Sequence, residues 1–458
     1  MVARRTSSLR VAVIGAGPSG FYATESLLRH HESVEIDLIE RLPTPYGLVR
    51  YGVAPDHQKI KSVTKLYDRT ANNPRVRFLG NVEYGKDLDH IDLERYYHAT
   101  VFAVGSPADR RLGIDGEDLQ GSLSATEFVA WYNGHPDYIN LQPNMHASSV
   151  AIIGMGNVAV DVARILAKSV DELRETDMAN HALEALAESK IKRIYMIGRR
   201  GPVQGKFTSQ ELRELGNLKN ANLILDPKQL ELDLASTQTV ETSPLAKRNL
   251  AILNELSTSS QETKSRELHL TFLASPQKIV GTNNVEAINL EINRLETGSE
   301  GYIRAIGTGK TFQLQAQMIL KSVGYKGTPL KGLPFDFERN IIPNAKGRII
   351  DSAGGKPLRG KYVTGWIKRG PTGVIGTNKA DALETVKGLL DDELPSPNNI
   401  NTKPQAITDL LKARGVLYVE FSDWQKLDTF ETELGSAENR PRVKVTNSAQ
   451  MLRISGVK

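Results

Sequence analysis

The sequence predicts an α/β protein that contains two Rossmann-like dinucleotide-binding domains. Two glycine-rich turns support this prediction, one near the N-terminus in "VAVIGAGPSG" and one further along in "SVAIIGMGNVAV". Each turn follows an apolar strand and opens a helical pattern, which is the order that a dinucleotide-binding fold requires. The third observation is the next strand, which ends in an acid after the first turn and in two arginines after the second.

Length and composition are those of a globular protein. The 458 residues suffice for two or three domains, and 40% of them are hydrophobic and 24% charged. No apolar run is long enough to span a bilayer. The start "MVARRTSSLR" is basic and serine-rich, but it lacks the apolar core of a secretory signal. We interpret it as a disordered lead and expect a monomeric, cytoplasmic protein.

The chain contains no cysteine. This excludes disulfides, a cysteine nucleophile, a redox-active cysteine pair and a cysteine-ligated iron–sulfur cluster within the chain. The net charge of +5 is a mild basic bias, which is compatible with an acidic protein partner. No run of lysine or arginine indicates a nucleic-acid-binding tail, and we expect no metal site.

The first glycine turn follows the apolar strand at 9–14 and precedes a helical pattern. Gly15 permits the tight turn, Gly17 lets the backbone approach a pyrophosphate, and Gly20 lets the helix pack closely on the strand. The N-terminus of the helix then offers N–H groups and a positive dipole to the phosphate. The next strand ends at Glu40, an acid that suits an adenosine ribose.

The segment after Glu40 narrows the choice of dinucleotide. This segment, "RLPTPYGLVRYGVAPDHQKIKSVTKL", is rich in proline and glycine and predicts a long ordered loop before a helix. A plain NAD site does not need such a loop, whereas an FAD site does, because backbone and apolar groups must line the isoalloxazine. The first site is therefore predicted to hold FAD.

The second turn carries Gly154, Gly156 and Ala159, in which alanine still permits fairly close packing of the helix. After a helical insertion, the next strand ends in Arg199 and Arg200, which cannot accept hydrogen bonds from a ribose diol. They can bind a 2′-phosphate through forked, charge-assisted hydrogen bonds of about 1.5–3 kcal/mol each. The sequence thus predicts an NADP(H) site, with a solvated basic turn as the alternative.

Two dinucleotide sites in one chain imply two cofactors that exchange electrons, a bound FAD and a transient NADPH. The order of the motifs predicts a discontinuous FAD domain at about 1–107 and 326–458, with the NADP domain at about 108–325. The fold class is therefore two Rossmann-like domains in a glutathione reductase-like architecture. Within the NADP domain, 228–266 is predicted to be helical, and 268–323 to form short strands with turns at "GTNN" and "GSEG".

The motifs together resemble the adrenodoxin reductase-like branch of ferredoxin–NADP reductases, and bacterial members of that branch most of all. The resemblance runs nearly end to end and is carried by "GAGPSGFYA", "PTPYGLVRYGVAPDH", "GNVAVDVARIL", "GRRGP" and "GWIKRGPTGVIGTNKADA". It implies a ferredoxin–NADP⁺ reductase, which takes hydride from NADPH on FAD and passes single electrons to a ferredoxin or similar acidic iron–sulfur protein.

The resemblance also implies the residues of both sites. Those near FAD would be Ser19, Glu40, Leu48, Tyr84, Trp366, Gly373, Val374 and Ile375. Those that hold NADP(H) would be Arg110, Met155, Gly156, Asn157, Val158, Arg199, Arg200, Glu211 and Gly373. The sequence departs from the family pattern at Tyr46, where a tryptophan often stands, and Met155 fills a variable position. Tyr84 is expected to contribute backbone only.

Three further expectations concern chemistry. A helix starting near Gly373 and ending at about Leu390 would direct its N-terminal dipole at the flavin and stabilise the reduced ring. His57 and Glu214 are the candidates for catalytic polar groups, and our hypothesis is that they pair and orient the nicotinamide. Cations that could meet an acidic ferredoxin around the flavin are Arg29, Lys59, Lys61 and Lys65.

Two other functions are compatible with the same motifs. One is the flavoprotein subunit of a larger reductase, such as the glutamate synthase small subunit, although that relative carries cysteine clusters that this chain lacks. The other is a non-catalytic NADPH-binding or sensor protein that keeps FAD for structure. Such a protein would hold a flavin that NADPH cannot bleach.

Overall fold

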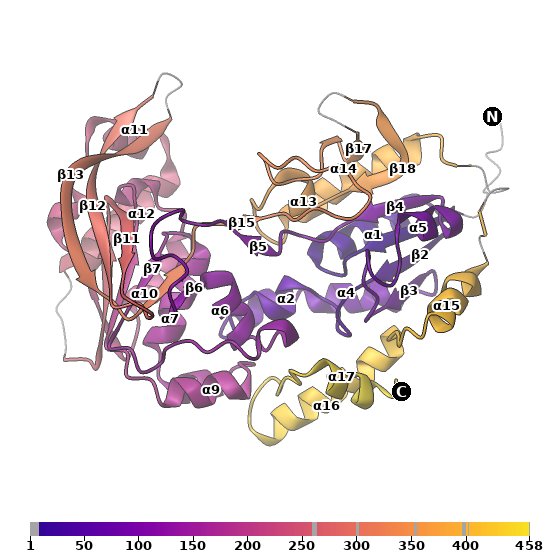
Figure 1. Ribbon diagram of the computed structural model, residues 1–458, viewed down its shortest axis with the longest axis horizontal. Coiled ribbons are helices and arrows are strands. Elements are labelled where there is room, and N and C mark those ends of the chain that lie inside the picture. The colour runs from indigo at the N-terminus through magenta and orange to yellow at the C-terminus, as the bar shows by residue number, and fades with distance from the viewer. Residues whose placement is uncertain are drawn as a thin grey trace. The chain divides into compact units, whose positions relative to one another are not determined.

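The computed structural model describes residues 9–258, 263–298, 302–351, 355–395, 400–401 and 403–457. The chain divides into two compact units (Figure 1). Unit 1 contains Met1–Val53, His57–Ala108 and Gly324–Lys458, and unit 2 contains Ala54–Asp56 and Asp109–Val323. No pattern in the sequence indicates that residues 54–56 cluster with unit 2. The short strands β5 (Ala108–Asp109) and β15 (Tyr325–Lys326) lie at the two ends of the long segment of unit 2, where the chain leaves unit 1 and returns to it.

Unit 1 is built on a seven-stranded sheet in the order β16-β17-β18-β4-β1-β2-β3. Its five parallel strands are β18 (Pro357–Val363), β4 (Ala99–Phe102), β1 (Leu9–Ile14), β2 (Val34–Ile39) and β3 (Val76–Leu79). Two short antiparallel strands extend one edge, namely β17 (Arg348–Ile350) and β16 (Asn344–Ala345). Figure 1 shows the indigo N-terminal strands beside orange elements from late in the chain, so unit 1 joins segments that are distant in sequence.

Every residue of β1 is buried, and its side chains alternate between two cores. Val11 and Val13 belong to a core shared with α1 (Pro18–His30), α14 (Thr377–Asp391) and α16 (Phe421–Ala437). Ala12 and Ile14 belong to a second core, on the side of α5 (His90–Tyr96) and α15 (Pro404–Ala413). The remaining helices of unit 1 are α2 (Leu48–Tyr51), α3 (Gln58–Lys61), α4 (Thr64–Ala71), α13 (Trp366–Arg369) and α17 (Ser448–Ser455).

Unit 2 has a six-stranded parallel sheet in the order β6-β14-β7-β8-β10-β9. The strands are β6 (Ser122–Ser124), β14 (Met318–Lys321), β7 (Ser149–Ile153), β8 (Arg193–Ile197), β10 (Arg266–Thr271) and β9 (Ala221–Ile224). A separate antiparallel sheet contains β11 (Ala274–Val280), β12 (Ala287–Thr297) and β13 (Ile303–Gln315). These last two strands have 11 and 13 residues, so the expectation of only short strands was wrong there.

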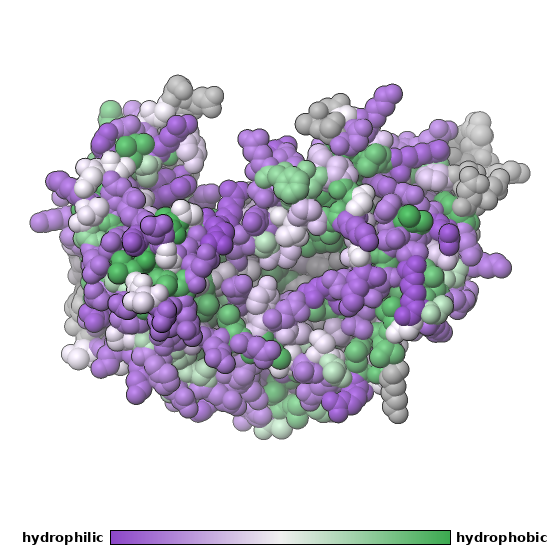
Figure 2. Space-filling model, in the orientation of Figure 1, coloured by the Kyte–Doolittle hydropathy of each residue, from purple (hydrophilic) through white to green (hydrophobic). Residues whose placement is uncertain are grey.

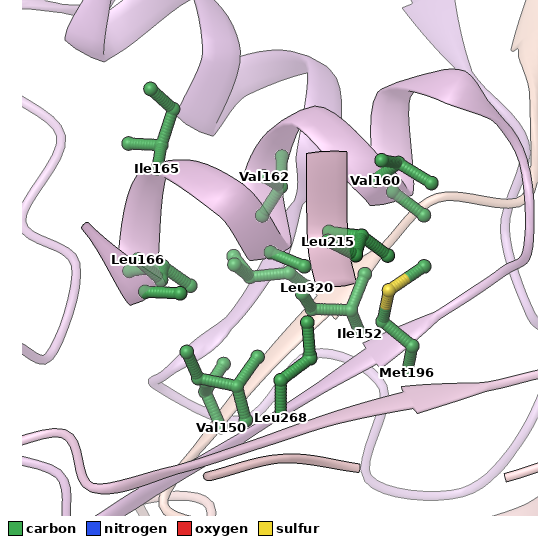
Figure 3. Close-up of a cluster of buried hydrophobic side chains, with 14 of the residues drawn as sticks. Val150, Ile152, Val160, Val162, Ile165, Leu166, Met196, Leu215, Leu268 and Leu320 are labelled. Atoms are coloured by element: carbon green, nitrogen blue, oxygen red, sulfur yellow. The ribbon is translucent and has the colours of Figure 1, made fainter. Parts of the chain in front are cut away.

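The helix after the second glycine turn, α7 (Asn157–Ala167), covers the parallel sheet of unit 2. In Figure 3 its apolar side chains meet those of β7, β8, β10 and β14, together with Leu215 of α10 (Ser209–Gly216). The other helices are α6 (Ala125–Tyr132), α8 (Val170–Arg174), α9 (Asn180–Ala187), α11 (Leu234–Thr242) and α12 (Pro244–Thr258). The predicted helical insertion is confirmed as α8 and α9, and the predicted polar helical stretch as α11 and α12.

The visible surface of both units is mostly hydrophilic, with apolar residues in small separate patches (Figure 2). None of the helices in the described part of the chain combines the length and apolar character needed to cross a membrane. The predicted turn "GSEG" lies, except for Gly298, outside the described residues.

Candidate nucleotide-binding sites

The glycines of the first turn serve two different purposes. A Cβ at Gly15 would lie 2.6 Å from the carbonyl oxygen of Ala103, and one at Gly20 only 1.9 Å from the carbonyl oxygen of Gly15. Packing of the strand and helix therefore requires glycine at both positions. A Cβ at Gly17 would meet only the Cα of Gly47, at an ordinary contact distance of 3.9 Å. Since the fold does not demand glycine there, Gly17 fits a site where a ligand approaches the backbone.

The N-terminus of α1 is arranged to receive an anion. Gly17 is the N-cap residue, and it has no side chain that could cap the N–H groups of the first turn. Pro18 occupies the first helical position, where its missing N–H removes no hydrogen bond. The first-turn N–H groups and the helix dipole together suit a pyrophosphate.

Glu40 directly follows β2 and lies against the same turn. Its carboxylate accepts hydrogen bonds from the backbone N–H of Ala16 at 2.8 Å and of Leu42 at 3.1 Å. Burial raises the pKa of Glu40 above its ordinary value. The carboxylate is therefore fixed at the carboxyl ends of β1 and β2, where the fold places the ribose of a dinucleotide.

The predicted loop after Glu40 folds back onto the glycine turn. The N–H of Tyr46 donates to the carbonyl oxygen of Ala16 at 2.8 Å. Gly47 has φ 48°, and a Cβ there would lie 3.0 Å from the Cα of Gly17. Leu48, the first residue of α2, is 40% exposed although it is apolar. The loop thus brings backbone and an apolar side chain beside the predicted FAD turn.

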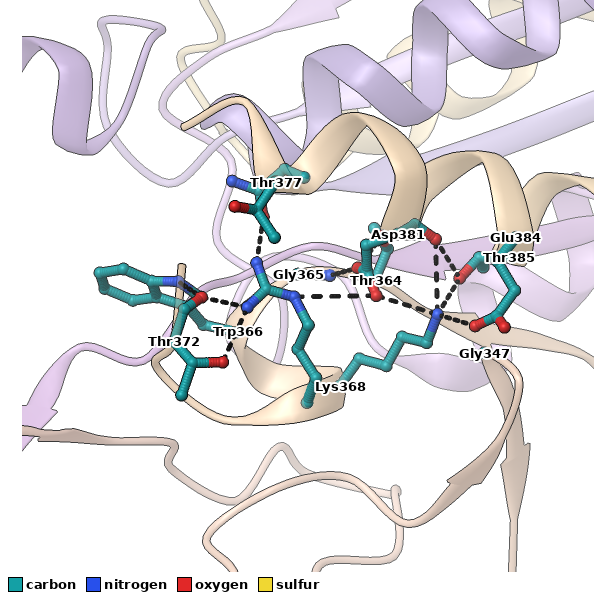
Figure 4. Close-up of polar contacts among 12 residues, drawn as sticks. Gly347, Thr364, Gly365, Trp366, Lys368, Thr372, Thr377, Asp381, Glu384 and Thr385 are labelled. Atoms are coloured by element: carbon teal, nitrogen blue, oxygen red, sulfur yellow. Dashed lines mark hydrogen bonds and ion pairs between the residues drawn. The ribbon is translucent and has the colours of Figure 1, made fainter. Parts of the chain in front are cut away.

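A second loop, from Gly365 to Gly376, also reaches the N-terminus of α1. A Cβ at Gly365, whose φ is 79°, would lie 2.6 Å from both the Cβ and Oγ of Ser19. Asp381 of α14 holds this loop, because it accepts hydrogen bonds from the N–H of Gly365 at 2.5 Å and the hydroxyl of Thr364 at 2.9 Å (Figure 4). Buried Lys368 forms an ion pair with Asp381 at 3.0 Å.

The side chains of this loop are oriented by contacts of their own. The ring of Trp366 lies 5.1 Å from that of Tyr325, and its Nε1–H donates to the carbonyl oxygen of Thr372 at 3.2 Å. Val374 is 65% exposed, while Ile375 packs against the core. The sequence did not single out Asp381 or Lys368, although both lie within the "GWIKRGPTGVIGTNKADA" motif.

The helix expected to start near Gly373 begins at Thr377 and ends at Asp391. Gly373 has φ 81°, which interrupts helical geometry. Between them lies a turn in which the N–H groups of residues 377, 378 and 379 donate to the carbonyl oxygens of residues 374, 375 and 376. This 3₁₀-type pattern continues the direction of α14 for one more turn, so residues 373–376 present the N-terminal end of the helix.

Tyr84 uses its side chain within unit 1. Its hydroxyl donates to the carbonyl oxygen of Lys331 at 2.7 Å, and its ring contacts that of Phe102 edge-on at the end of β4. Burial raises the pKa of Tyr84 to about 12. The side chain thus has partners within unit 1, and the contact of the Tyr84 backbone with FAD stays a prediction.

The second glycine turn follows the same logic in unit 2. A Cβ at Gly154, whose φ is 142°, would lie 2.3 Å from the carbonyl oxygen of Ser322, so packing requires glycine. A Cβ at Gly156 would meet no described atom within 4 Å, which leaves space for a ligand. Ala159, in the first turn of α7, is fully buried. The variant turn is therefore closed by the protein at its first and third positions and open at its second.

The start of α7 contains an unused polar atom. The N-cap residue, Gly156, has no side chain that could cap this helix, and the Oδ1 atom of Asn157 is buried with no hydrogen-bond partner among the described residues. A buried unsatisfied acceptor is uncommon and indicates an absent partner, such as a ligand hydroxyl. Met155 and Val158 pack partly against the core, and the N–H of Lys206 donates to the carbonyl oxygen of Met155 at 2.8 Å.

Arg199 and Arg200 follow β8, with their backbones fixed and their side chains uncommitted. The carbonyl oxygen of Arg199 accepts from the Nδ2 of Asn293 at 2.8 Å, and that of Arg200 accepts from the N–H of Leu273 at 3.2 Å. Within the described ranges, neither guanidinium takes part in an ion pair. Two uncompensated cations on a rigid turn fit a doubly charged phosphate.

Glu211 and Glu214 lie on α10. The carboxylate of Glu211 accepts from the N–H and the hydroxyl of Thr208 at 3.1 and 3.0 Å, which forms a capping box. Burial raises the pKa of Glu211. The carboxylate of Glu214 lies 3.4 Å from a guanidinium nitrogen of Arg164, on α7. Each glutamate therefore has a structural task in addition to any contact with a ligand.

Arg164 is the centre of a charge cluster that the sequence did not reveal. It binds Asp56 at 2.7 Å and Asp161 at 2.7 Å, and Asp56 also accepts from Lys168 at 2.7 Å. Burial alone would raise the pKa of Asp56, but the hydrogen bonds and charges of Arg164 and Lys168 hold it below the usual value. The spacing of Asp161 and Arg164 by three residues was the only local signal, and Arg164 lies in an otherwise apolar run.

The remaining predicted residues, His57 and Arg110, lie in different units. His57 belongs to unit 1, at the residue before α3, and is partly buried, whereas Glu214 belongs to unit 2. Arg110 is exposed in unit 2, just after β5. The pairing of His57 with Glu214, and the contacts of Arg110 and Gly373 with NADP(H), stay predictions.

Only two of the four predicted surface cations, Lys59 and Lys65, are both exposed and outside the ion pairs among the described residues. Lys59 and Lys65 are exposed, but Lys61 is only 8% exposed while its neighbour Ile60 is 47% exposed. The short helix α3 therefore turns Lys61 inward and Ile60 outward, the reverse of the usual arrangement for these residue types. Arg29 is already paired with Glu25 at 2.6 Å, one turn away on α1. In the part of the chain that is described, no cluster of His, Asp and Glu could hold a metal ion.

Comparison with known proteins gives matches over nearly the whole chain. The profile of the family described as pyridine nucleotide-disulphide oxidoreductase matches residues 9–197. The chain is 42% identical to the protein named mitochondrial NADPH:adrenodoxin oxidoreductase of Arabidopsis thaliana, over 99% of this chain and 97% of that protein. It is equally 42% identical to NADPH-ferredoxin reductase FprA of Mycobacterium leprae, over 97% of this chain and 98% of the relative.

Solved structures agree. The structure of Mycobacterium tuberculosis FprA in complex with NADPH superposes with a TM-score of 0.92 at 41% sequence identity. The match covers 98% of this chain and 100% of that one. The similarity therefore extends through both units and the C-terminal helices.

Proposed function

Because the chain belongs to the family of NADPH-ferredoxin reductases and adrenodoxin reductases, we propose that it transfers electrons from NADPH, through bound FAD, to an iron–sulfur protein. The observation that carries this proposal is the pair of dinucleotide turns, one in each unit, with opposite charges beside them. Glu40 offers a carboxylate at the first turn, and Arg199 and Arg200 offer two unpaired cations at the second. One chain thus holds a site for each of two different dinucleotides.

The residues of unit 1 fit FAD. The open first turn of α1 would bind the pyrophosphate, and Glu40 would accept from a ribose hydroxyl. The glycines at 47 and 365 would let the backbone of their loops approach the cofactor. The turn at 373–376 would present the positive end of α14 to the ring and so favour its reduced, negatively charged form. When bound, FAD supplies the link between NADPH, which gives two electrons together as a hydride, and an iron–sulfur protein, which accepts one electron at a time.

The residues of unit 2 fit NADP(H). Gly156 leaves room for the pyrophosphate at the start of α7, and the buried Oδ1 of Asn157 can accept a hydrogen bond from the coenzyme. Arg199 and Arg200 would bind the 2′-phosphate that distinguishes NADPH from NADH. Met155, Val158, Arg110 and Glu211 of unit 2, together with Gly373 of unit 1, complete the proposed contacts.

We assign His57 and Glu214 the role of orienting the nicotinamide. No proton needs to be abstracted from a substrate in hydride transfer, so a conservative replacement should slow the reaction without abolishing it. His57→Gln is expected to lower the rate of flavin reduction in stopped-flow measurements while NADPH affinity changes little. If reduction by NADPH stays at the wild-type rate, the role is withdrawn.

The electron acceptor is proposed at two levels of detail. Relatives are named for both ferredoxin and adrenodoxin, and both are small iron–sulfur proteins, so this class of acceptor follows from the family. We propose a ferredoxin as the partner and ferredoxin–NADP⁺ reductase as the activity. The cytoplasmic location and the monomeric state remain predictions from the sequence.

One experiment tests the function and its rivals together. The purified chain should be yellow, and anaerobic NADPH should bleach its flavin. A non-catalytic sensor would keep its colour under NADPH, and a subunit of a larger reductase would be reduced but would not pass electrons to ferredoxin by itself. Reduction of ferredoxin by the isolated chain therefore supports the proposal, and a flavin that NADPH cannot bleach overturns it.

A further inference from the structure

The flavin loop of unit 1 has an unusual backbone that needs support. Tyr46 has φ 83° although it is not glycine, and Gly47 follows with φ 48°. A bulky residue holds such a conformation only where its surroundings fix it. These two residues also contact the glycine turn, through the N–H of Tyr46 and the Cα of Gly47.

The support comes from the C-terminal helix α16. The hydroxyl of Tyr46 donates to Asp68 and accepts from the Nε1–H of Trp424 at 3.3 Å, and the rings of Tyr46 and Trp424 meet edge-on at 5.7 Å. About two turns further along α16, Glu431 binds Arg50 of α2 through two parallel hydrogen bonds of 2.6 and 2.8 Å. Trp424 and Glu431 are seven residues apart and so face the same side of α16.

The Arg50–Glu431 pair is completely enclosed. Glu431 has no exposed side-chain surface and the side chain of Arg50 is 4% exposed. Arg442 and the N–H of Val445 donate to the same carboxylate at 3.1 and 2.8 Å, and the Nζ of Lys444 donates to the carbonyl oxygen of Arg50 at 3.2 Å. Although burial opposes ionisation, the charge of Arg50 keeps the pKa of Glu431 below its ordinary value.

Such a pair is suited to fixing geometry. Desolvation offsets much of the attraction in a buried ion pair, so apolar residues of equal volume would often stabilise a fold as well. A forked guanidinium–carboxylate contact, in contrast, permits one relative orientation. Arg50 lies only three residues after Gly47, so its orientation sets the position of α2 and of the loop before it.

We propose that Glu431 is a positioning residue for flavin binding: through Arg50 it holds α2 so that the Tyr46–Leu48 loop closes on the glycine turn and retains FAD. The inference rests on the proposed function, because it requires FAD at this turn. It assigns to the last quarter of the chain the task of keeping the cofactor bound, a task distinct from recognition of NADPH in unit 2.

The test measures release of FAD from the holoenzyme by the rise in flavin fluorescence. Glu431→Gln keeps the shape but weakens the forked contact, and Arg50→Lys keeps the charge but removes the fork. Both variants should release FAD about tenfold faster or more, as expected for the loss of a charge-assisted hydrogen bond. The KM for NADPH of the loaded enzymes should stay within about twofold of wild type, because distant sites act independently.

The matched control is Arg414→Lys. Arg414 forms a forked contact of the same kind with Asp92, at 2.7 and 2.9 Å. This contact also joins the C-terminal segment to the body of unit 1, but its acidic partner lies on α5, away from the flavin loop. It should release FAD like wild type. Equal release by all three variants and wild type overturns the inference, and so does an equal acceleration in the control. If Glu431→Gln does not fold, Arg50→Lys decides. A wild-type chain that never binds FAD contradicts the proposed function instead.

Discussion

At the scale of single residues, the glycines of the first turn divide into two that the packing requires, Gly15 and Gly20, and one that it does not, Gly17. A Cβ at Gly20 would overlap the carbonyl oxygen of Gly15, whereas a Cβ at Gly17 would make only an ordinary contact. The second turn repeats this division at Gly154 and Gly156. The sequence pattern assigns the first position to the tight turn, the second to the approach of a pyrophosphate and the third to helix packing. Only the structure shows at which of these positions there is room for a Cβ.

This division predicts different outcomes for two alanine substitutions. Gly20→Ala should prevent folding or lower the midpoint of thermal unfolding sharply, because strand and helix must separate. Gly17→Ala should fold normally, as judged by far-ultraviolet circular dichroism, but should contain little FAD after purification. If Gly17→Ala binds FAD as tightly as wild type, the approach of the pyrophosphate to this residue is not as we describe it.

At the scale of elements, local patterns predicted the strand–turn–helix units well and missed what depends on distant packing. The strand before each glycine turn and the helix after it follow from hydrophobic periodicity and glycine spacing. The start of α14 was misplaced by four residues, since a 3₁₀-type turn imitates the helix. The inward turn of Lys61 had no local signal at all.

Contacts between distant segments explain the largest omissions. Arg50 and Glu431 are 381 residues apart in the chain, and Asp56 and Arg164 are 108 apart. Nothing in the composition of either segment identifies its partner. A buried Arg within a helical apolar run, such as Arg164, indicates that some carboxylate must approach, but not which one.

The Asp56–Arg164 contact gives unit 2 an acid-sensitive element. The pKa of Asp56 is lowered in the folded chain, so its stabilisation is fully present above the unfolded-state pKa of about 3.9 and is lost as the pH falls below it. Asp56→Asn should therefore destabilise unit 2 near neutral pH by about 1–3 kcal/mol, and the difference from wild type should shrink in acid. Urea unfolding curves of the variant and wild type, followed by far-ultraviolet circular dichroism at neutral and acid pH, measure this difference.

A surface pair in the same unit provides the control. Asp118→Asn removes the ion pair between Asp118 and Arg111, whose side chains are 77% and 61% exposed respectively. It should change the free energy of unfolding little at any pH. Equal stability of Asp56→Asn and wild type at neutral pH would show that the cluster around Arg164 does not stabilise unit 2.

At the scale of the whole molecule, two dinucleotide sites in separate units define an electron-transfer protein. The net charge of +5 and the exposed Lys59 and Lys65 suit an acidic acceptor. If charge guides the encounter, ferredoxin reduction at limiting ferredoxin should slow steeply as salt rises from about 0.01 to 0.3 M, because screening shortens the range of attraction. The rate of flavin reduction by saturating NADPH provides the internal reference and should change far less. A flat response of ferredoxin reduction to salt would contradict an electrostatic encounter.

The central claim is that two cations after β8 select the coenzyme for a flavin held in the other unit. The most direct test is anaerobic reduction of the flavin by NADPH and by NADH, in wild type and in the double variant Arg199→Gln, Arg200→Gln. Wild type should favour NADPH by about a hundredfold or more in the apparent second-order rate constant, since two charge-assisted contacts are involved. The variant should lose most of this preference because its rate constant with NADPH falls, while its rate constant with NADH stays close to that of wild type. A variant that keeps the wild-type preference, or a wild type that uses both coenzymes equally, would contradict the account.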